Sequence, residues 1–208
     1  MQIIDMNTWH RKEHFQFFYA EDFPQYSICT QIDITHFLDF VHENKLPFYY
    51  SMIHAAMTAA NRNENFRYRI RDGQVVLHDR IHPTFTDLEK GSDLFKIVTV
   101  NMSDDFREFT GNARAASSAK RDFFPDAVTA KRDDLVYVTC LPWISFTQVS
   151  HTFNLNANDA APRFVWGKYF EVNGRQMLPF SIQVNHALVD GVHVGQFVTD
   201  LGKYLDAL

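Results

Sequence analysis

The sequence is poor in leucine, in cysteine and in positive charge. Among 208 residues there are 13 Leu, two cysteines far apart at Cys29 and Cys140, and 20 Lys+Arg against 25 Asp+Glu, for a net charge of -5. A chain without a basic excess lacks the field that attracts a phosphate backbone, so nucleic acid is not expected as a partner. The two cysteines form no metal-binding or redox motif, and a reducing, cytoplasmic setting is expected.

Long apolar runs are also missing. No run approaches the ~18 residues that a membrane span requires, so no membrane is expected as a partner. The first eleven residues contain no apolar core of a signal peptide. No repeat, low-complexity tract or Pro/Ser-rich linker divides the chain, which predicts one domain over residues 1–208. A chain of this length can bury roughly 70% of its unfolded surface and needs no disulfide bonds to be stable.

Phenylalanine is the residue in excess, with 20 Phe against 13 Leu. Because leucine normally leads the composition of a globular protein, aromatic side chains are expected to fill much of the core or to line a site. Helical spacing assigns Phe37, Phe40 and Phe197 to the core.

Hydrophobic periodicity predicts a mixture of helices and strands. Helices are expected over residues 32–44, 50–61, 104–120 and 194–208. Strands are expected over residues 94–100 and 135–140. Two hairpins are expected around Asp72-Gly73 and Asn173-Gly174, because these pairs tolerate the positive φ angles of tight turns. This mixture excludes an all-parallel sheet.

The most informative stretch covers residues 180–193. A β-rich run ends at His186, and Asp190-Gly191 opens the last helix. A histidine at such a junction can be held rigidly while it faces a cleft, and histidine titrates close to neutral pH, which suits a general base. Taken singly, however, a histidine is more often an ordinary structural residue and an aspartate here is more often a helix cap.

Further short motifs are spread over nearly the whole chain. They are residues 9–15 (WHRKEHF), 32–35 (IDIT), 124–125 (FP), 141–143 (LPW), 153–156 (FNLN) and 186–193 (HALVDGVH). Together they resemble the chloramphenicol acetyltransferase family, whose active-site motif is His-x-x-x-Asp-Gly-x-His. The resemblance implies an α/β two-layer sandwich with a mixed sheet. It also implies a homotrimer with active sites at the subunit interfaces.

The activity implied by the resemblance is O-acetyl transfer from acetyl-CoA, a co-substrate rather than a bound cofactor, with no metal and no covalent acyl-enzyme. His186 would be the general base that takes the proton of an acceptor hydroxyl. Thr139 stands where the family has a serine that stabilises the oxyanion. Asp190 and Arg11 would form an ion pair that supports the site.

Substrate positions are implied in the same way. Trp143 and Tyr169 match aromatic residues that contact coenzyme A in the family. The acceptor site would be lined by Phe18, Tyr26, Phe124, Phe153, Leu155 and Val165. The acceptor implied is chloramphenicol or a similar hydroxyl compound, and acetylation of chloramphenicol would confer antibiotic resistance.

Three alternatives stay open. The chain could be an acetyltransferase for another small hydroxyl acceptor, an acyltransferase for a lipoyl thiol, or a non-catalytic binding protein on the same fold. The pattern His-x-x-x-Asp-Gly is shared with dihydrolipoyl acyltransferases, but the sequence contains no lipoyl module. Cys140, next to Thr139, could be a nucleophile. Inert packing is favoured because the family has no covalent step.

Overall fold

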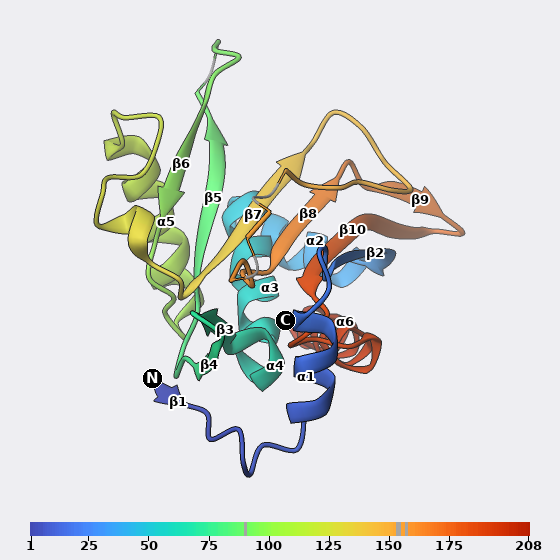
Figure 1. Ribbon diagram of the computed structural model, residues 1–208. Coiled ribbons are helices and arrows are strands. Elements are labelled where there is room, and N and C mark those ends of the chain that lie inside the picture. Colours follow the sequence, from blue (N-terminus) through green and yellow to red (C-terminus); the bar gives the residue numbers. More distant parts are fainter. Residues whose placement is uncertain (90, 153–154, 157) are drawn as a thin grey trace.

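The architecture is taken from a computed structural model that describes residues 1–89, 91–152, 155–156 and 158–208. A mixed β-sheet forms one layer, and helices packed against it form the other (Figure 1). The predicted α/β class with a mixed sheet is therefore confirmed.

The main sheet crosses the whole molecule. Within the described part of the chain its strand order is β2 (Gln25–Asp33), β10 (Arg175–Asn185), β8 (Arg163–Gly167), β7 (Leu135–Leu141), β5 (His82–Leu88) and β6 (Phe95–Thr99), with β9 (Phe170–Val172) paired to β10. The pairs β7–β8 and β5–β7 are parallel, and the other pairs are antiparallel. Strand β10 is the longest, and its end positions the site described below.

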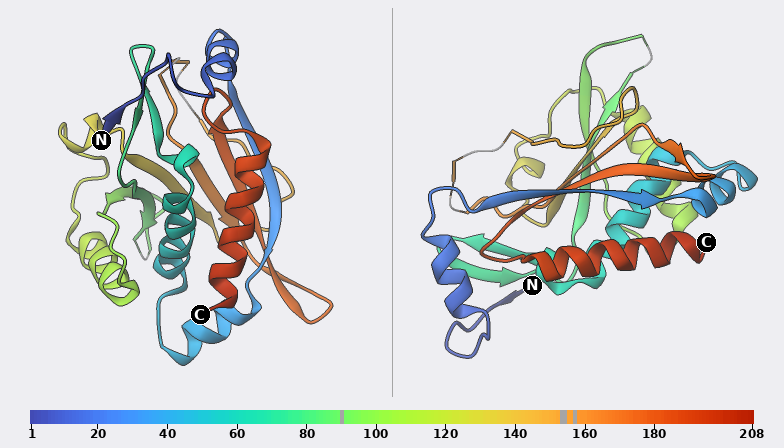
Figure 2. Two further views of the ribbon diagram at one scale, coloured as in Figure 1. Left: turned by 90° about the horizontal axis from the view of Figure 1, so that it is seen from below. Right: turned by 90° about the vertical axis from the view of Figure 1, so that its right-hand side faces the viewer.

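The helical layer buries the aromatic core. Its members are α2 (Thr35–Glu43), α3 (Phe48–Arg62), α5 (Phe106–Ala119) and α6 (Gly191–Asp206). Helices α3 and α6 pack side by side (Figure 2). Phe197 of α6 stacks on Phe164 of the sheet at 5.0 Å. Phe37 and Phe197 are fully buried, whereas Phe40 is half-buried and packs its ring 5.5 Å from Phe106.

A second, small sheet anchors the N-terminal part of the chain. It consists of β1 (Gln2–Ile3), β4 (Gln74–Leu77) and β3 (Tyr68–Arg71), and it lies near α1 (Lys12–Tyr19) and α4 (Glu64–Arg67). The short 3-10 helix Thr129–Lys131 precedes strand β7. The Trp9 ring lies 5.3 Å from Tyr68 and 5.9 Å from Phe15. These contacts fix α1 against the rest of the protein.

Most of the predicted elements are present. The hairpins at Asp72 and Asn173 are confirmed, with φ angles of 50° and 51°. The helix predicted from residue 32 begins later, because Ile32 and Asp33 end strand β2. The first strand of the hairpin at Asp72 begins at Tyr68, directly after the short helix α4 that contains Phe66. No helix in the described ranges is long and apolar enough to cross a bilayer.

Candidate functional site

His186 follows directly on the last residue of β10, in a turn that is held on both sides. The His186 amide donates to the Pro24 carbonyl at 2.8 Å. The Asn185 side chain accepts from the Ala187 amide at 2.9 Å. Such an Asx turn fixes the backbone conformation where the regular hydrogen bonds of a strand have ended. The histidine is therefore held at the edge of the sheet, as predicted from its place between strand and helix.

Two aromatic rings hold the His186 imidazole in place. The Phe18 ring of α1 is stacked on it at 3.8 Å with an interplanar angle of 10°. The Tyr26 ring of β2 lies 4.6 Å away. Burial, with a smaller effect from Asp190, raises the pKa of Tyr26 to about 12, so its hydroxyl stays protonated and donates to the Val189 carbonyl at 3.1 Å. The His186 side chain nevertheless remains 34% exposed.

Arg11 and Asp190 meet beside this imidazole. Arg11 Nη1 donates to Asp190 Oδ2 at 2.6 Å, and the two side chains are 8% and 22% exposed. Burial alone would raise the pKa of Asp190, but the hydrogen bond and the charge of Arg11 outweigh it, and this pKa lies below its usual range. The carboxylate is therefore ionised at neutral pH.

The contact between Asp190 and His186 decides which imidazole nitrogen is accessible. His186 Nδ1 lies 3.2 Å from Asp190 Oδ1. Neither atom has a hydrogen-bond partner among the described residues, and both are buried. Nε2, on the other side of the ring, is therefore the nitrogen that can accept a proton from an incoming hydroxyl.

Thr139 lines a separate cavity of about 1070 Å³. Its hydroxyl lies 3.3 Å from the Thr86 hydroxyl, and Trp143 lines the same cavity with 67% of its side chain exposed. The ring of Tyr169 lies 6.1 Å from Phe48, another lining residue. Thr139 and Trp143 thus line one cavity with largely apolar walls, and Tyr169 lies next to one of its lining residues.

Thr139 and His186 lie far apart within one chain. Strand register pairs Thr139 with Val165, and Val165 with Ser181. His186 follows Ser181 by five residues, which at about 3.4 Å per residue is roughly 17 Å along β10. The two predicted catalytic groups are therefore separated by roughly 17 Å along the strands and by two strand positions across the sheet.

The predicted acceptor residues are distributed in the same way. Phe18 and Tyr26 contact His186, whereas Val165, 1% exposed, lies beside Thr139. Phe124 is 65% exposed, in a segment that hydrogen-bonds to the edge strand β6 through Phe123. Leu155 is 84% exposed. Phe153 lies outside the described residues. Of the five predicted acceptor residues that the structure describes, one chain brings Phe18 and Tyr26 to the histidine.

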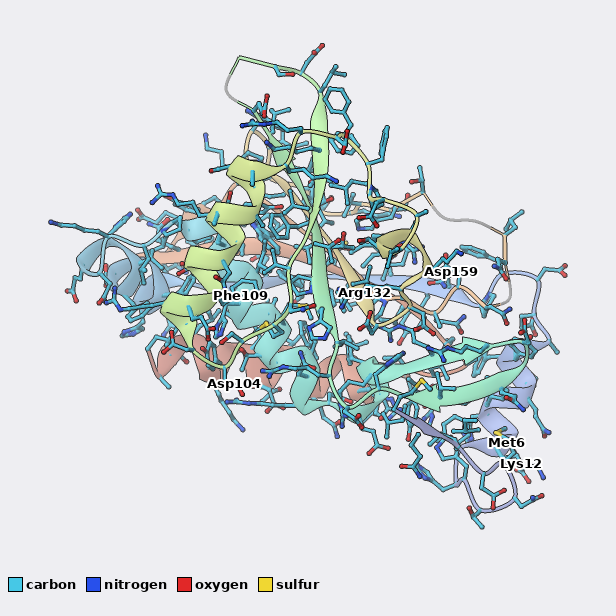
Figure 3. The ribbon with its side chains drawn as sticks, turned by 90° about the vertical axis from the view of Figure 1, so that its left-hand side faces the viewer. Met6, Lys12, Asp104, Phe109, Arg132 and Asp159 are labelled. Carbon is cyan, nitrogen blue, oxygen red and sulfur yellow. The ribbon has the colours of Figure 1, made fainter. Side chains whose placement is uncertain are left out.

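Sequence reasoning did not identify the polar groups that fix the turn. The backbone carbonyl of Asp159 accepts from the side chains of Gln25 and Asn185, at 2.6 and 3.1 Å. Asp159, labelled in Figure 3, also binds Arg163 through its carboxylate at 2.6 Å. Asn65 donates to the Leu188 carbonyl at 2.8 Å. Apart from the pair of Asp159 and Arg163, these contacts join segments far apart in the chain, and only Asn185 could have been suspected, from its place next to His186.

Two other kinds of chemistry are a nucleophilic attack by the Cys140 thiol and catalysis by a metal ion. Burial raises the pKa of the Cys140 thiol to about 12, and only a thiolate is a good nucleophile. Within the described ranges, no group of three or more His, Cys, Asp or Glu side chains is arranged to hold a metal ion.

Comparisons with known proteins agree with this geometry. The profile of the chloramphenicol acetyltransferase family matches residues 1–202. A chloramphenicol acetyltransferase of Klebsiella sp is 34% identical over 210 residues, covering 98% of this chain and 93% of that protein. A chloramphenicol acetyltransferase 2 of Haemophilus influenzae is 30% identical over 208 residues, covering 98% and 96%.

Solved structures support the same relationship. A chloramphenicol acetyltransferase superposes with a TM-score of 0.92 at 29% identity, covering 98% of this chain and 99% of that one. The cubic core of a pyruvate dehydrogenase complex superposes with a TM-score of 0.71 at 16% identity, covering 93% and 86%. At that identity the second match concerns the fold alone.

Proposed function

The chain belongs to the chloramphenicol acetyltransferase family, a family of acyltransferases, and we propose that it transfers an acetyl group from acetyl-CoA to a hydroxyl of chloramphenicol. The observation that carries this proposal is the His186 imidazole. It is clamped by Phe18 and Tyr26, its Nδ1 is buried against Asp190, and its Nε2 is left for a substrate.

The proposed reaction transfers one acyl group and moves one proton from the acceptor hydroxyl to the departing thiolate by way of His186. His186 Nε2 takes the proton of the acceptor hydroxyl as the oxygen attacks the thioester carbonyl of acetyl-CoA. The resulting oxyanion is stabilised by the hydroxyl of Thr139. When this intermediate collapses, the carbon–sulfur bond breaks, and the proton on His186 passes to the departing thiolate. The products are the acetyl ester and free coenzyme A.

The cavity at Thr139 suits the acyl donor. Its volume of about 1070 Å³ and its walls of Phe48, Leu88, Phe95 and Trp143 can enclose a long thiol-bearing arm, since ligand cavities are usually apolar with a few polar groups. Thr139 supplies the polar group. Trp143 and Tyr169 would contact the coenzyme at the exposed rim.

We further propose a homotrimer in which each site is formed by two chains. The support is that His186 and Thr139 of one chain are separated by roughly 17 Å along the strand direction, too far to act on one substrate atom. Large apolar side chains are also exposed near the proposed acceptor and coenzyme positions, namely Phe95, Phe124, Trp143 and Leu155. His186 of one chain would then meet Thr139 of its neighbour. A cytoplasmic location and a role in antibiotic resistance complete the proposal, and the free cysteines Cys29 and Cys140 support the location.

A shared site predicts complementation between two inactive variants. His186→Ala removes the base, and Thr139→Val removes the oxyanion donor, which typically costs about 10²–10³ in kcat. When differently tagged copies of the two are co-expressed, roughly a quarter of the sites in a random cyclic assembly contain both intact groups. Purification on both tags retains only mixed trimers, and each of these has one such site in three, so we expect the purified mixture to regain about a third of wild-type turnover. Activity no higher than that of either variant alone would contradict the shared site.

A second prediction concerns Gly167, which pairs with Leu141, a residue that lines the cavity. A Cβ at this position would lie 2.6 Å from the Ile144 carbonyl oxygen and 3.0 Å from the Phe146 ring. We expect Gly167→Ala to displace the segment that carries Trp143, to cost about 1–3 kcal/mol in the free energy of unfolding, and to raise KM for acetyl-CoA more than KM for the acceptor. Gly111→Ala is the control, because nothing lies within 4 Å of its Cβ. Equal KM values for acetyl-CoA in both variants would remove this role of Gly167.

The acceptor is tested by a panel of compounds. Release of free thiol from acetyl-CoA is followed with chloramphenicol, with other small aromatic alcohols and with dihydrolipoamide. We expect the highest kcat/KM for chloramphenicol. A higher value for another alcohol would replace the proposed acceptor, and a higher value for dihydrolipoamide would favour the lipoyl alternative.

A further inference from the structure

His193 occupies the third position of helix α6, one turn from the residues already assigned. Its Nδ1 accepts a hydrogen bond from the Asp190 backbone amide at 2.9 Å, and its own amide donates to the Asp190 carbonyl at 3.0 Å. At this position of a helix, Glu or Gln usually caps the preceding amide in this way. A histidine that replaces them adds a group that can be protonated.

This cap, the hydrogen bond from the Asp190 amide to His193 Nδ1, exists only while Nδ1 carries no proton. An imidazolium has a donor on both nitrogens, so protonation would set two N–H groups against each other at 2.9 Å. Burial, followed by the positive charge of Arg11, lowers the pKa of His193, with a smaller contribution from His10; the charge of Asp190 acts in the opposite direction. Asn63, the residue that caps helix α4, also contacts residue 193: its uncharged side-chain amide donates to the His193 carbonyl at 3.1 Å.

The cap acts on the residue that connects Arg11 to His186. The Asp190 carboxylate receives Arg11 Nη1 at 2.6 Å on one oxygen, and its other oxygen lies 3.2 Å from His186 Nδ1. A shift of the Asp190 backbone therefore moves the carboxylate relative to both partners. Asn65 still holds the Leu188 carbonyl at 2.8 Å, so loss of the cap would disturb this turn without unfolding it.

We propose that His193 is a positioning residue for acyl transfer, whose neutral imidazole caps Asp190 and thereby keeps the His186 imidazole in its reactive orientation, and that protonation of His193 releases this cap. The inference rests on the proposed function. It assigns the second histidine of the motif a role distinct from that of His186, because His193 contacts neither substrate nor the reacting atoms.

Two variants separate the cap from mere packing. In His193→Asn the side-chain oxygen stands the same number of bonds from the backbone as Nδ1, so it can accept from the Asp190 amide but cannot be protonated. His193→Leu fills the space without an acceptor. We expect His193→Leu to lower kcat roughly tenfold or more with little change in either KM, and His193→Asn to restore most of the loss. Full activity in His193→Leu, or no recovery in His193→Asn, would overturn the inference.

The pH profile is the readout that packing alone would not change. In the wild type, protonation of His186 removes the base and protonation of His193 releases the cap, so the acid limb of the logarithm of kcat/KM should be steeper than one over the pH range in which His193 gains its proton. In His193→Asn the slope should be one. Profiles are compared over the pH range in which the far-ultraviolet circular dichroism stays constant. Equal slopes in the two proteins would overturn the proton-sensitive cap.

Hydrogen exchange tests the cap without any turnover. We expect amides 186–193 to exchange faster in His193→Leu than in the wild type and in His193→Asn, with other segments unchanged. Wild-type protein that acetylates no acceptor would contradict the proposed function, whereas unchanged exchange in His193→Leu would contradict the cap itself. The two failures are therefore distinguishable.

Discussion

Replacing His186 by alanine is expected to lower kcat for chloramphenicol acetylation by about 10²–10⁴-fold, the usual contribution of a general base. The imidazole is the group whose Nε2 remains for the substrate, with Phe18 and Tyr26 on its faces. The substitution removes the base without changing the backbone contacts of the turn, in which the residue 186 amide donates to Pro24. KM for acetyl-CoA should change little, since the substitution leaves the residues that line the cavity at Thr139 unchanged.

Matched variants make this result specific. His186→Gln keeps polarity and approximate size without a usable base, and it should be as inactive as His186→Ala. His36→Ala removes an exposed histidine on helix α2 and should retain wild-type kcat. Turnover by His186→Ala within a few-fold of the wild type would favour a binding protein or a different base.

The second large effect is expected at the ion pair of Arg11 and Asp190. The pair is mostly buried, and Arg11→Ala would leave the carboxylate without its main partner. Breaking a buried pair singly costs about 3–5 kcal/mol, and we expect the lower end because Asp190 is 22% exposed. The loss of orientation at His186 should also reduce kcat by up to about 10²-fold.

Chemical denaturation and initial rates measure the two effects. Asp190→Asn should lower kcat as well, since it removes the charge that binds Arg11. Arg175→Ala breaks the more exposed pair with Asp33 and should cost at most about 1 kcal/mol. Wild-type turnover in both Arg11→Ala and Asp190→Asn would exclude a supporting role for the pair.

The pH dependence of this stabilisation has a defined sign. The pKa of Asp190 is lower in the folded protein than its ordinary value of 3.8. The pair therefore contributes its full stability above the unfolded-state pKa and loses it as the pH falls through the folded-state pKa. The difference in unfolding free energy between wild type and Arg11→Ala should accordingly be constant from neutral pH to about pH 5 and shrink below that.

Sequence patterns predicted the turns that depend on the residues within them. They missed elements that depend on pairing with distant strands. The turns at Asp72-Gly73 and Asn173-Gly174 have the positive φ angles that their residue types favour. Strand β5, in contrast, was not predicted. It is paired on both sides, with β6 and β7, and its side chains are largely buried. A short strand of this kind lacks the alternation that marks a half-exposed one.

The features of the site also divide into those that the residues alone indicate and those that they do not. His186 could be singled out from the residues alone, because a strand, a histidine and an Asp-Gly pair follow one another. The partnership of Arg11 and Asp190 spans 179 positions and was implied only by the family resemblance. The distance between His186 and Thr139 follows from strand register, which the sequence pattern does not specify.

The excess of phenylalanine divides between core and site. Phe37, Phe164 and Phe197 are fully buried, and Phe18 lies against the His186 imidazole. Phe124 is 65% exposed in the single chain. In the proposed trimer it would line the acceptor site together with residues of a neighbouring chain.

One measurement tests the central claim most directly. Purified wild-type protein is incubated with acetyl-CoA, with and without chloramphenicol, while thiol release is recorded and the products are identified by mass spectrometry. The proposed function predicts thiol release that depends on chloramphenicol and matches, mole for mole, the formation of acetylated chloramphenicol. Thiol release that does not depend on chloramphenicol, or no release at all, would contradict it.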